Sequence, residues 1–302
     1  MRLVTFVKDG EARPGLLEGE TVLDISSDSA WAEPLNCVPT TVLDLLRTEV
    51  DPLSLNFSGC KRTYPLNDIE LRAPIERPGK LLALAGNYAD HLKESGHEWA
   101  EKILTTPRVF MKPQTSVTGP NSEIIYPPNA GNIDWECELA VVMGRTARFV
   151  NAADGLDYVA GYTVMNDVSE RSLVHGVDRD SRDGDKWFDW LNGKWFDTFA
   201  PMGPSLVLKD EIPDPHVLDI RLWVNGEEKQ SANTGQMIFS VAELVEWVSR
   251  FMTLEPGDII STGTAAGVGS ASGTYLSPGD LVEAEIPPIG RLINAVTAYQ
   301  GV

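Results

Sequence analysis

A chain of 302 residues that is 42% hydrophobic and 23% charged can bury a large core, so it needs no disulfide or structural metal to fold. Its 25 lysines and arginines against 44 aspartates and glutamates give a net charge of -19, which repels nucleic acid and anionic lipid, so we expect neither as a partner. No apolar run approaches the roughly 20 residues that span a bilayer, and no apolar secretion signal opens the sequence, so we expect a cytoplasmic protein.

The first 72 residues predict a small separate unit. Residues 3–7 and 21–25 are β-type runs with glycine-containing turns between them, and residues 40–47 have a helical period with a threonine available as N-cap. Prolines and a glycine then interrupt the sequence between residues 74 and 79. We therefore expect a small α/β domain over 1–72, followed by a main domain over 73–302.

Strand signals dominate the main domain. The predicted strands are 80–85, 108–112, 123–126, 134–143, 158–167, 205–208, 219–225, 258–261, 281–286 and 291–298. The predicted helices are 88–101, 152–156, 169–175 and 240–251, of which the last begins with a capping box from Ser240 and Glu243. Because helices do not alternate regularly with strands, we expect an α+β fold that is mostly β: an antiparallel β-roll or sandwich with peripheral helices.

Acidic residues alternate along one predicted strand. Two-residue periodicity places Asp134, Glu136 and Glu138 on one face of residues 134–143, with neighbouring carboxylates rooted roughly 7 Å apart. Such a row can converge on one cation and is repulsive without one. An isolated pair of glutamates in this pattern is more often a solvated strand edge, so the pattern alone leaves both interpretations open.

A second strand supplies another carboxylate. Residues 158–167 end in Asn166 and Asp167, at a strand terminus where ligands often bind, although an ordinary turn has the same sequence. Three carboxylates without a histidine or cysteine nearby favour a hard cation, Mg²⁺ or Mn²⁺, with Ca²⁺ as a further option.

Four segments in a fixed order carry a resemblance to a known family. They are the glutamate pair at 136–138, M-N-D-V-S at 165–169, G-K-x-F-D-T-F-x-P-x-G-P at 193–204 and M-T-L-x-P-G-D-x-I-x-T-G-T at 252–264. Residues 72–298 thereby resemble the fumarylacetoacetate hydrolase superfamily. The resemblance implies a mixed β-roll in a homodimer that acts on a small anionic 2-oxo acid or 1,3-dicarbonyl compound. It also implies a divalent cation held by Glu136, Glu138 and Asp167.

The resemblance also implies roles for individual residues. Lys194 matches the family's active-site lysine, Thr198 a threonine beside the metal that we expect to contact substrate, and Thr264 a threonine that binds the substrate carboxylate. His91 and Glu94 match the histidine–glutamate dyad on a mobile lid helix.

Local chemistry supports two of these roles. His91 and Glu94 are three residues apart, so on a helix the carboxylate can orient the imidazole, although a surface pair has the same spacing. Lys194 has five aromatic neighbours, which we expect to desolvate its ammonium and lower its pKa. They are Trp187, Phe188, Trp190, Trp195 and Phe196. A lysine snorkelling out of an aromatic core is the alternative.

One segment departs from the family pattern. Val174 stands where many members have a substrate-facing glutamine, and residues 175–192 form a longer, strongly charged stretch. We expect this stretch to supply different substrate contacts, through Arg179 or Arg182.

Other cofactor and nucleophile motifs are missing. The glycines of residues 263–269 do not have dinucleotide-binding spacing, Gly193-Lys194 lacks the upstream glycine of a phosphate-binding loop, and there is no G-x-S-x-G nucleophile elbow. The three cysteines are widely spaced without a C-x-x-C pair, which argues against structural zinc. We expect no organic cofactor.

Three functions follow as hypotheses. The first is a metal-dependent hydrolase that cleaves a carbon–carbon bond of a 2,4-dioxo acid, with water activated by His91 and Glu94 and the leaving enolate stabilised by the cation and Lys194. The second is an oxaloacetate-type decarboxylase or keto–enol isomerase, which needs no attacking water. The third is a non-catalytic protein that binds a small acid.

Overall fold

The computed structural model describes residues 1–35, 38–94, 96, 102–172, 180 and 182–301. Two large sheets build the molecule, and most neighbouring strands in them are antiparallel. Three pairs are parallel, namely β14 with β8, β17 with β6, and β19 with β9. The mixed, mostly β fold expected from the sequence is therefore confirmed.

The larger sheet runs from the N-terminal strands into the main domain. Its order is β4 (Thr63–Pro65), β3 (Thr21–Asp24), β2 (Glu11–Glu18), β1 (Arg2–Lys8), β14 (Ala200–Leu208), β12 (Val159–Asn166), β11 (Cys137–Met143), β17 (Ile259–Ser261), β6 (Leu81–Ala85) and β7 (Arg108–Lys112). Strand β5 (Glu70–Arg72) also pairs with β1, and β8 (Val117–Thr118) pairs with β14. The contact between β1 and β14 makes the sheet continuous across the predicted boundary at residue 72, and the division into two domains stays a prediction.

The second sheet packs against the first. Its order is β16 (Glu227–Asn233), β15 (Asp219–Val224), β18 (Leu281–Ile286), β19 (Gly290–Ala298) and β9 (Ile124–Tyr126). The main hydrophobic core lies between the two sheets and includes Leu139, Val141, Leu222 and Ile286. A second core joins the N-terminal unit to the larger sheet. All of β11 is buried, which explains why its apolar run is continuous rather than alternating.

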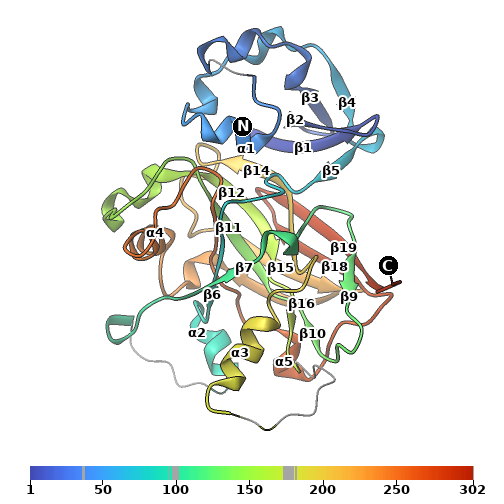
Figure 1. The fold of residues 1–302 in the computed structure, drawn as a ribbon, viewed down its shortest axis with the longest axis vertical. Coiled ribbons are helices and arrows are strands. Elements are labelled where there is room, and N and C mark those ends of the chain that lie inside the picture. The colour runs from blue at the N-terminus through green and yellow to red at the C-terminus, as the bar shows by residue number, and fades with distance from the viewer. Residues whose placement is uncertain (36–37, 95, 97–101, 173–179, 181, 302) are drawn as a thin grey trace.

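Five α-helices surround the sheets in the described part of the chain. They are α1 (Val42–Arg47), α2 (Ala89–Glu94), α3 (Asp185–Asn192), α4 (Val241–Ser249) and α5 (Gly269–Ser272). In Figure 1, α2, α3 and α5 gather at the end of the molecule opposite the N-terminal strands. No described helix is both long and apolar enough to cross a membrane.

Some local predictions were wrong. The predicted helix 169–175 begins instead as strand β13 (Ser169–Glu170), which pairs with β10 (Ile133–Asp134), while residues 173–175 lie outside the described residues. The predicted strand 134–143 is broken between β10 and β11. Residues 152–156 belong to a 3₁₀ helix over Ala152–Tyr158 rather than an α-helix. Helix 88–101 is described only as α2, since residue 95 and residues 97–101 lie outside the described residues.

Candidate metal centre and active-site cavity

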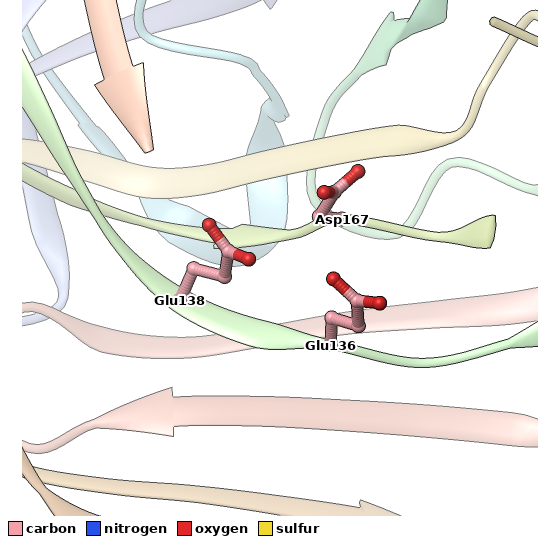
Figure 2. Close-up of side chains that lie close together, drawn as sticks. All are labelled: Glu136, Glu138 and Asp167. Atoms are coloured by element: carbon pink, nitrogen blue, oxygen red, sulfur yellow. The ribbon is translucent and has the colours of Figure 1, made fainter. Parts of the chain in front are cut away.

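Three carboxylates meet where two neighbouring strands end. Glu136 lies in the break before β11, Glu138 lies within β11, and Asp167 directly follows β12. One oxygen from each carboxylate lies within 4.8 Å of the others, and Figure 2 shows the three side chains close together. The backbone N–H of Asp167 donates to the carbonyl of Glu136 at 2.8 Å, so the two strand ends are tied at this point.

Glu138 has the features of a metal ligand. It is fully buried, and its Oε2 accepts from the Ser261 hydroxyl and from the backbone N–H of Gly263 at 2.9 Å, whereas Oε1 has no partner among the described residues. Burial raises its pKa well above the ordinary value, and the nearby charges of Asp167 and Glu136 raise it further. Because buried carboxylate oxygens rarely lack a partner, a hard dication fits this all-oxygen site.

Buried cations complete the cluster. The Lys194 ammonium donates to Glu136 Oε2 at 2.9 Å and to Asp167 Oδ2 at 2.8 Å, and only 2% of its side chain is exposed. Lys112 donates to Asp167 and to the carbonyl of Val168, and Arg171 donates to Glu136. These pairs reduce the repulsion among the three carboxylates.

The expected direction of the Lys194 pKa was wrong. Burial alone would lower this pKa, but Asp167 and Glu136 outweigh it, so the pKa is raised. For Glu136 the effects have the opposite signs. Burial would raise its pKa, but the charges of Lys194 and Arg171 outweigh burial and lower the pKa to about 2. Lys112 behaves as the sequence suggested for Lys194, because burial there lowers the pKa.

Asp134 does not join the triad. It accepts from the backbone N–H groups of Gly269 at 2.6 Å and Ser270 at 3.1 Å, and from the Arg171 guanidinium at 2.9 Å. The break between β10 and β11 ends the strict alternation on which the predicted common face depended, so Asp134 anchors the start of α5.

The histidine–glutamate pair forms at α2. His91 Nδ1 lies 2.9 Å from Glu94 Oε1, and the Glu94 carboxylate also accepts from the backbone N–H of Gly267, with Oε2 at 2.9 Å. Both side chains are largely buried. With the Nδ1 proton directed at Glu94, Nε2 is left as the basic nitrogen.

A cavity of about 540 Å³ brings these groups together. It is lined by Leu84, Ala85, Gly86, His91, Leu92, Arg108, Glu136, Arg171, Lys186, Trp187, Trp190, Lys194, Thr264 and Ser270. A volume of this size suits a small-molecule ligand. His91, Lys194, Thr264 and one triad carboxylate therefore face one space.

The two predicted threonines have different surroundings. The Thr264 hydroxyl donates to the carbonyl of Cys137 and accepts from Gln230 Nε2, both at 2.9 Å, while the residue lines the cavity. Thr198 has a left-handed backbone with φ of 68°, and its hydroxyl accepts from the N–H of Ile125 at 2.9 Å. Thr198 is not among the lining residues.

Of the two arginines predicted from the long charged stretch, Arg182 is not in the described lining of the cavity. Arg182 has a side chain that is 78% exposed and pairs with Asp185 at 3.1 Å, next to the first turn of α3. Arg179 lies outside the described residues. The described lining of the cavity contains two other arginines, Arg108 and Arg171.

Sequence reasoning missed several cationic residues of the site. Arg108, Phe110 and Lys112 share one face of β7 by strand alternation. Arg108 lines the cavity, the Phe110 ring lies 5.4 Å from the Lys194 ammonium, and Lys112 contacts Asp167. The sequence signal that could have found Lys112 is its position two residues after Phe110, on the same buried strand face. Because an unpaired buried ammonium is costly, a lysine on such a face is expected to have a charged partner.

The glycine-rich segment 263–269 binds carboxylates through its backbone. Gly263, Gly267 and Gly269 donate their N–H groups to Glu138, Glu94 and Asp134, respectively. The segment therefore positions the acidic groups of the site.

Comparison with known proteins agrees with this architecture. The sequence pattern of the fumarylacetoacetate hydrolase C-terminal domain matches residues 80–297. A bovine mitochondrial oxaloacetate tautomerase is 41% identical over 98% of this chain and 91% of its own length. A 2,4-didehydro-3-deoxy-L-rhamnonate hydrolase from a Sphingomonas species is 38% identical over 99% of this chain and 97% of its own length.

A solved structure provides a further comparison. Maleylpyruvate hydrolase from a Sphingobium species, in complex with a manganese(II) ion and pyruvate, superposes with a TM-score of 0.74 at 29% identity, covering 99% of this chain and all of that one. Since the family pattern spans most of the chain and the relatives match along its length, the protein belongs to the fumarylacetoacetate hydrolase superfamily.

Proposed function

We propose that this protein is a divalent-metal-dependent enzyme that interconverts the keto and enol forms of a 2-oxo acid of the oxaloacetate type. The observation that carries the proposal is one cavity whose lining includes Glu136 of the buried carboxylate triad and a histidine oriented by a glutamate. The similarity to oxaloacetate tautomerases along nearly the whole chain supports the choice of reaction. This order differs from the sequence-based one, which placed hydrolysis first.

Each group of residues has a role in this proposal. Glu136, Glu138 and Asp167 hold the cation, for which we propose Mg²⁺ or Mn²⁺. When bound, such a cation supplies Lewis-acid stabilisation of negative charge on the 2-oxo oxygen. The Lys194 ammonium, already held by Glu136 and Asp167, adds a fixed positive charge beside the place where that charge develops.

His91 moves the proton. Its Nε2 takes a proton from the carbon next to the 2-oxo group and delivers it to the 2-oxo oxygen, and in the reverse direction it moves the enol O–H proton back to that carbon. Glu94 fixes the ring orientation through Nδ1, and Gly267 in turn fixes the Glu94 carboxylate. A keto–enol interconversion needs no other reacting group from the protein.

Hydrolysis of a 2,4-dioxo acid is the second candidate function. The same dyad could take a proton from water instead of carbon, and a relative similar over nearly its full length is named a hydrolase. Decarboxylation of a 2-oxo diacid also passes through an enolate. We therefore choose an experiment that separates the products.

The test uses metal-loaded protein with oxaloacetate and with acetylpyruvate. We expect faster loss of the enol's ultraviolet absorbance with oxaloacetate, without excess carbon dioxide, and no cleavage of acetylpyruvate. Carbon dioxide release would indicate a decarboxylase, and two carboxylic acid products would indicate the hydrolase. No turnover of either compound, despite metal binding, would favour the non-catalytic binding protein and contradict the proposal.

The expected substrate contacts, homodimer and cellular location are also proposals. Thr264 lines the cavity and is kept as a substrate contact, whereas the placement of Thr198 and Arg182 gives such a role no support. A homodimer would show twice the chain mass of 33.0 kDa in light scattering. A cytoplasmic location stays a prediction, and the bovine relative is named as mitochondrial.

A further inference from the structure

The charge of the cavity is opposite to that of the molecule. Its described lining contains four permanently cationic side chains but a single carboxylate, that of Glu136, in a chain of net charge -19. The four are Arg108, Arg171, Lys186 and Lys194. Such a local reversal raises the concentration of anions at the site.

Two of the four cations are already used within the protein. Lys194 pairs with Glu136 and Asp167, and Arg171 pairs with Asp134 and Glu136. Their charges compensate the buried acidic cluster. They therefore leave little positive charge for a ligand beyond the group that binds at the triad.

The other two cations have no such partner in the part of the chain that the structure describes. Neither Arg108 nor Lys186 forms an ion pair with any described residue, although several other exposed lysines and arginines of the chain do. Both side chains line the cavity and keep contact with solvent. A guanidinium and an ammonium that line the same cavity, and that have no ion-pair partner among the described residues, can together bind a carboxylate.

Their position is at a distance from the triad. Arg108 begins β7, and Lys112, which contacts Asp167, ends it. Four strand rises separate their Cα atoms by about 13 Å. Helix α3 brings Lys186 to the same cavity, because the Trp190 ring packs on Phe110 of β7 with centroids 4.8 Å apart. The two free cations therefore lie where the far end of an extended ligand would be.

We propose that Arg108 and Lys186 bind the second carboxylate of a 2-oxo diacid and thereby select diacids over monoacids. The inference rests on the proposed function, because it assumes that the 2-oxo acid end of the ligand binds at the triad. It adds the ligand's second charge and the two residues that recognise it.

The test compares two ligands that differ only at the far end. 2-Oxoglutarate carries a second carboxylate where 2-oxopentanoate, with the same number of carbons, has a methyl group. Calorimetry with manganese-loaded protein measures the affinity of each ligand for wild type and for the double variant R108Q/K186Q. The double variant R221Q/K61Q removes the same charges at exposed positions outside the cavity lining and serves as the control.

We expect R108Q/K186Q to weaken 2-oxoglutarate binding by about 10- to 100-fold, as the loss of charged hydrogen bonds implies, and 2-oxopentanoate binding by less than about threefold. The control should change neither affinity by more than about twofold. Equal weakening of both ligands, or unchanged binding of 2-oxoglutarate, would overturn the inference alone. If wild type binds neither ligand, the proposed function fails and the inference fails with it.

Discussion

At the scale of single residues, charge partners decide how Lys194 behaves. Phe110 and Trp190 lie over its ammonium, and such an environment alone would favour the neutral amine. The charges of Asp167 and Glu136 outweigh this effect, so they raise the pKa of Lys194 and keep it protonated. The carboxylates depend on the lysine in return, because buried negative charge without compensation is strongly destabilising.

The variant Lys194→Met tests this dependence. In a chelator, we expect its free energy of unfolding to fall by about 3–5 kcal/mol, because Glu136 and Asp167 lose their shared cation. Excess Mn²⁺ should restore more stability to the variant than it adds to wild type, since the metal then neutralises the same carboxylates. Urea unfolding with and without Mn²⁺ measures both effects. Equal stability of variant and wild type in chelator would contradict the ion-pair account.

His91 and Glu94 should have separable contributions. We expect His91→Gln to lower kcat/KM by about 10²- to 10⁴-fold, the usual contribution of a positioned acid–base group. Glu94→Gln keeps an oxygen that can accept from His91 and from Gly267, so its loss should be smaller than that of Glu94→Ala. Steady-state kinetics of the three variants on the same substrate checks this order. A His91→Gln enzyme with full activity would remove histidine from the mechanism.

The sequence predicted that Glu136, Glu138 and Asp167 lie together, as they do in the structure, whereas their role as metal ligands stays a prediction. The cations beside them were predicted less well. Lys112 and Arg171 could not be assigned, since only the folded chain shows that Lys112, at the end of an edge strand, reaches Asp167. Which cation meets which carboxylate is a property of packing, not of local sequence.

At the scale of elements, the glycine-rich segment after β17 positions the acidic groups. Gly267 has φ of +101°, and a Cβ added there would lie 2.1 Å from the carbonyl oxygen of Lys229. Its N–H therefore reaches Glu94 along a path that other residues cannot follow.

Gly267→Ala should lose both stability and activity. We expect a cost of about 1–3 kcal/mol in the free energy of unfolding from backbone strain and the clash, with a fall in kcat/KM because Glu94 loses its anchor. Gly273→Ala is the matched control: this glycine also has positive φ, but a Cβ there meets nothing within 4 Å. Denaturant unfolding and kinetics of the two variants provide the comparison. Equal losses in both would show that the clash and the Glu94 contact are unimportant.

Helix α4 provides a pH-dependent test outside the site. Its capping box joins Ser240 and Glu243, and Lys102 also donates to Glu243. Burial would raise the pKa of Glu243, but the hydrogen bonds from Lys102 and Ser240 outweigh it and lower the pKa below 4.5. A lowered folded pKa means that the charge contributes stability above about pH 4.5, and that this contribution is lost as pH falls through the folded pKa.

Glu243→Gln keeps the capping geometry but removes the charge. We expect the variant to be less stable than wild type by about 0.5–1 kcal/mol near neutral pH, and the difference to shrink at about pH 3.5. Urea unfolding at the two pH values measures the difference. A stability difference that widens in acid would show that the Glu243 charge does not stabilise the folded protein.

The strands and the helix that the sequence did not predict have no strong hydrophobic periodicity. Strand β16 is a polar edge strand, and β2 contains Pro14 and Gly15, so neither has the alternation typical of a strand. Helix α3 lies within the strongly charged stretch 175–192, and its apolar residues include exposed aromatics such as Trp187 and Phe188. Where a clear capping box existed, as at α4, the predicted helix was confirmed within two residues.

At the scale of the whole molecule, the fold brings distant parts of the chain to one end. The cavity takes residues from α2, β7, α3 and the segment after β17, while the triad comes from the ends of β11 and β12. Antiparallel pairing of β11 with β12 sets Cys137 opposite Asn166, and this register places Asp167 beside Glu136. Sequence alone indicated the fold class and the family but not this register, because long-range pairing has no local signature.

The proposed function depends on one hard dication bound by Glu136, Glu138 and Asp167 together. Anomalous diffraction from crystals soaked in Mn²⁺ tests it most directly, because the manganese signal locates the ion without reference to activity. We expect one strong anomalous peak at about 2.0–2.4 Å from an oxygen of each of the three carboxylates, with Glu138 contributing Oε1, which has no partner among the described residues. Fully ordered carboxylates with no peak among them, at saturating Mn²⁺, would contradict the account.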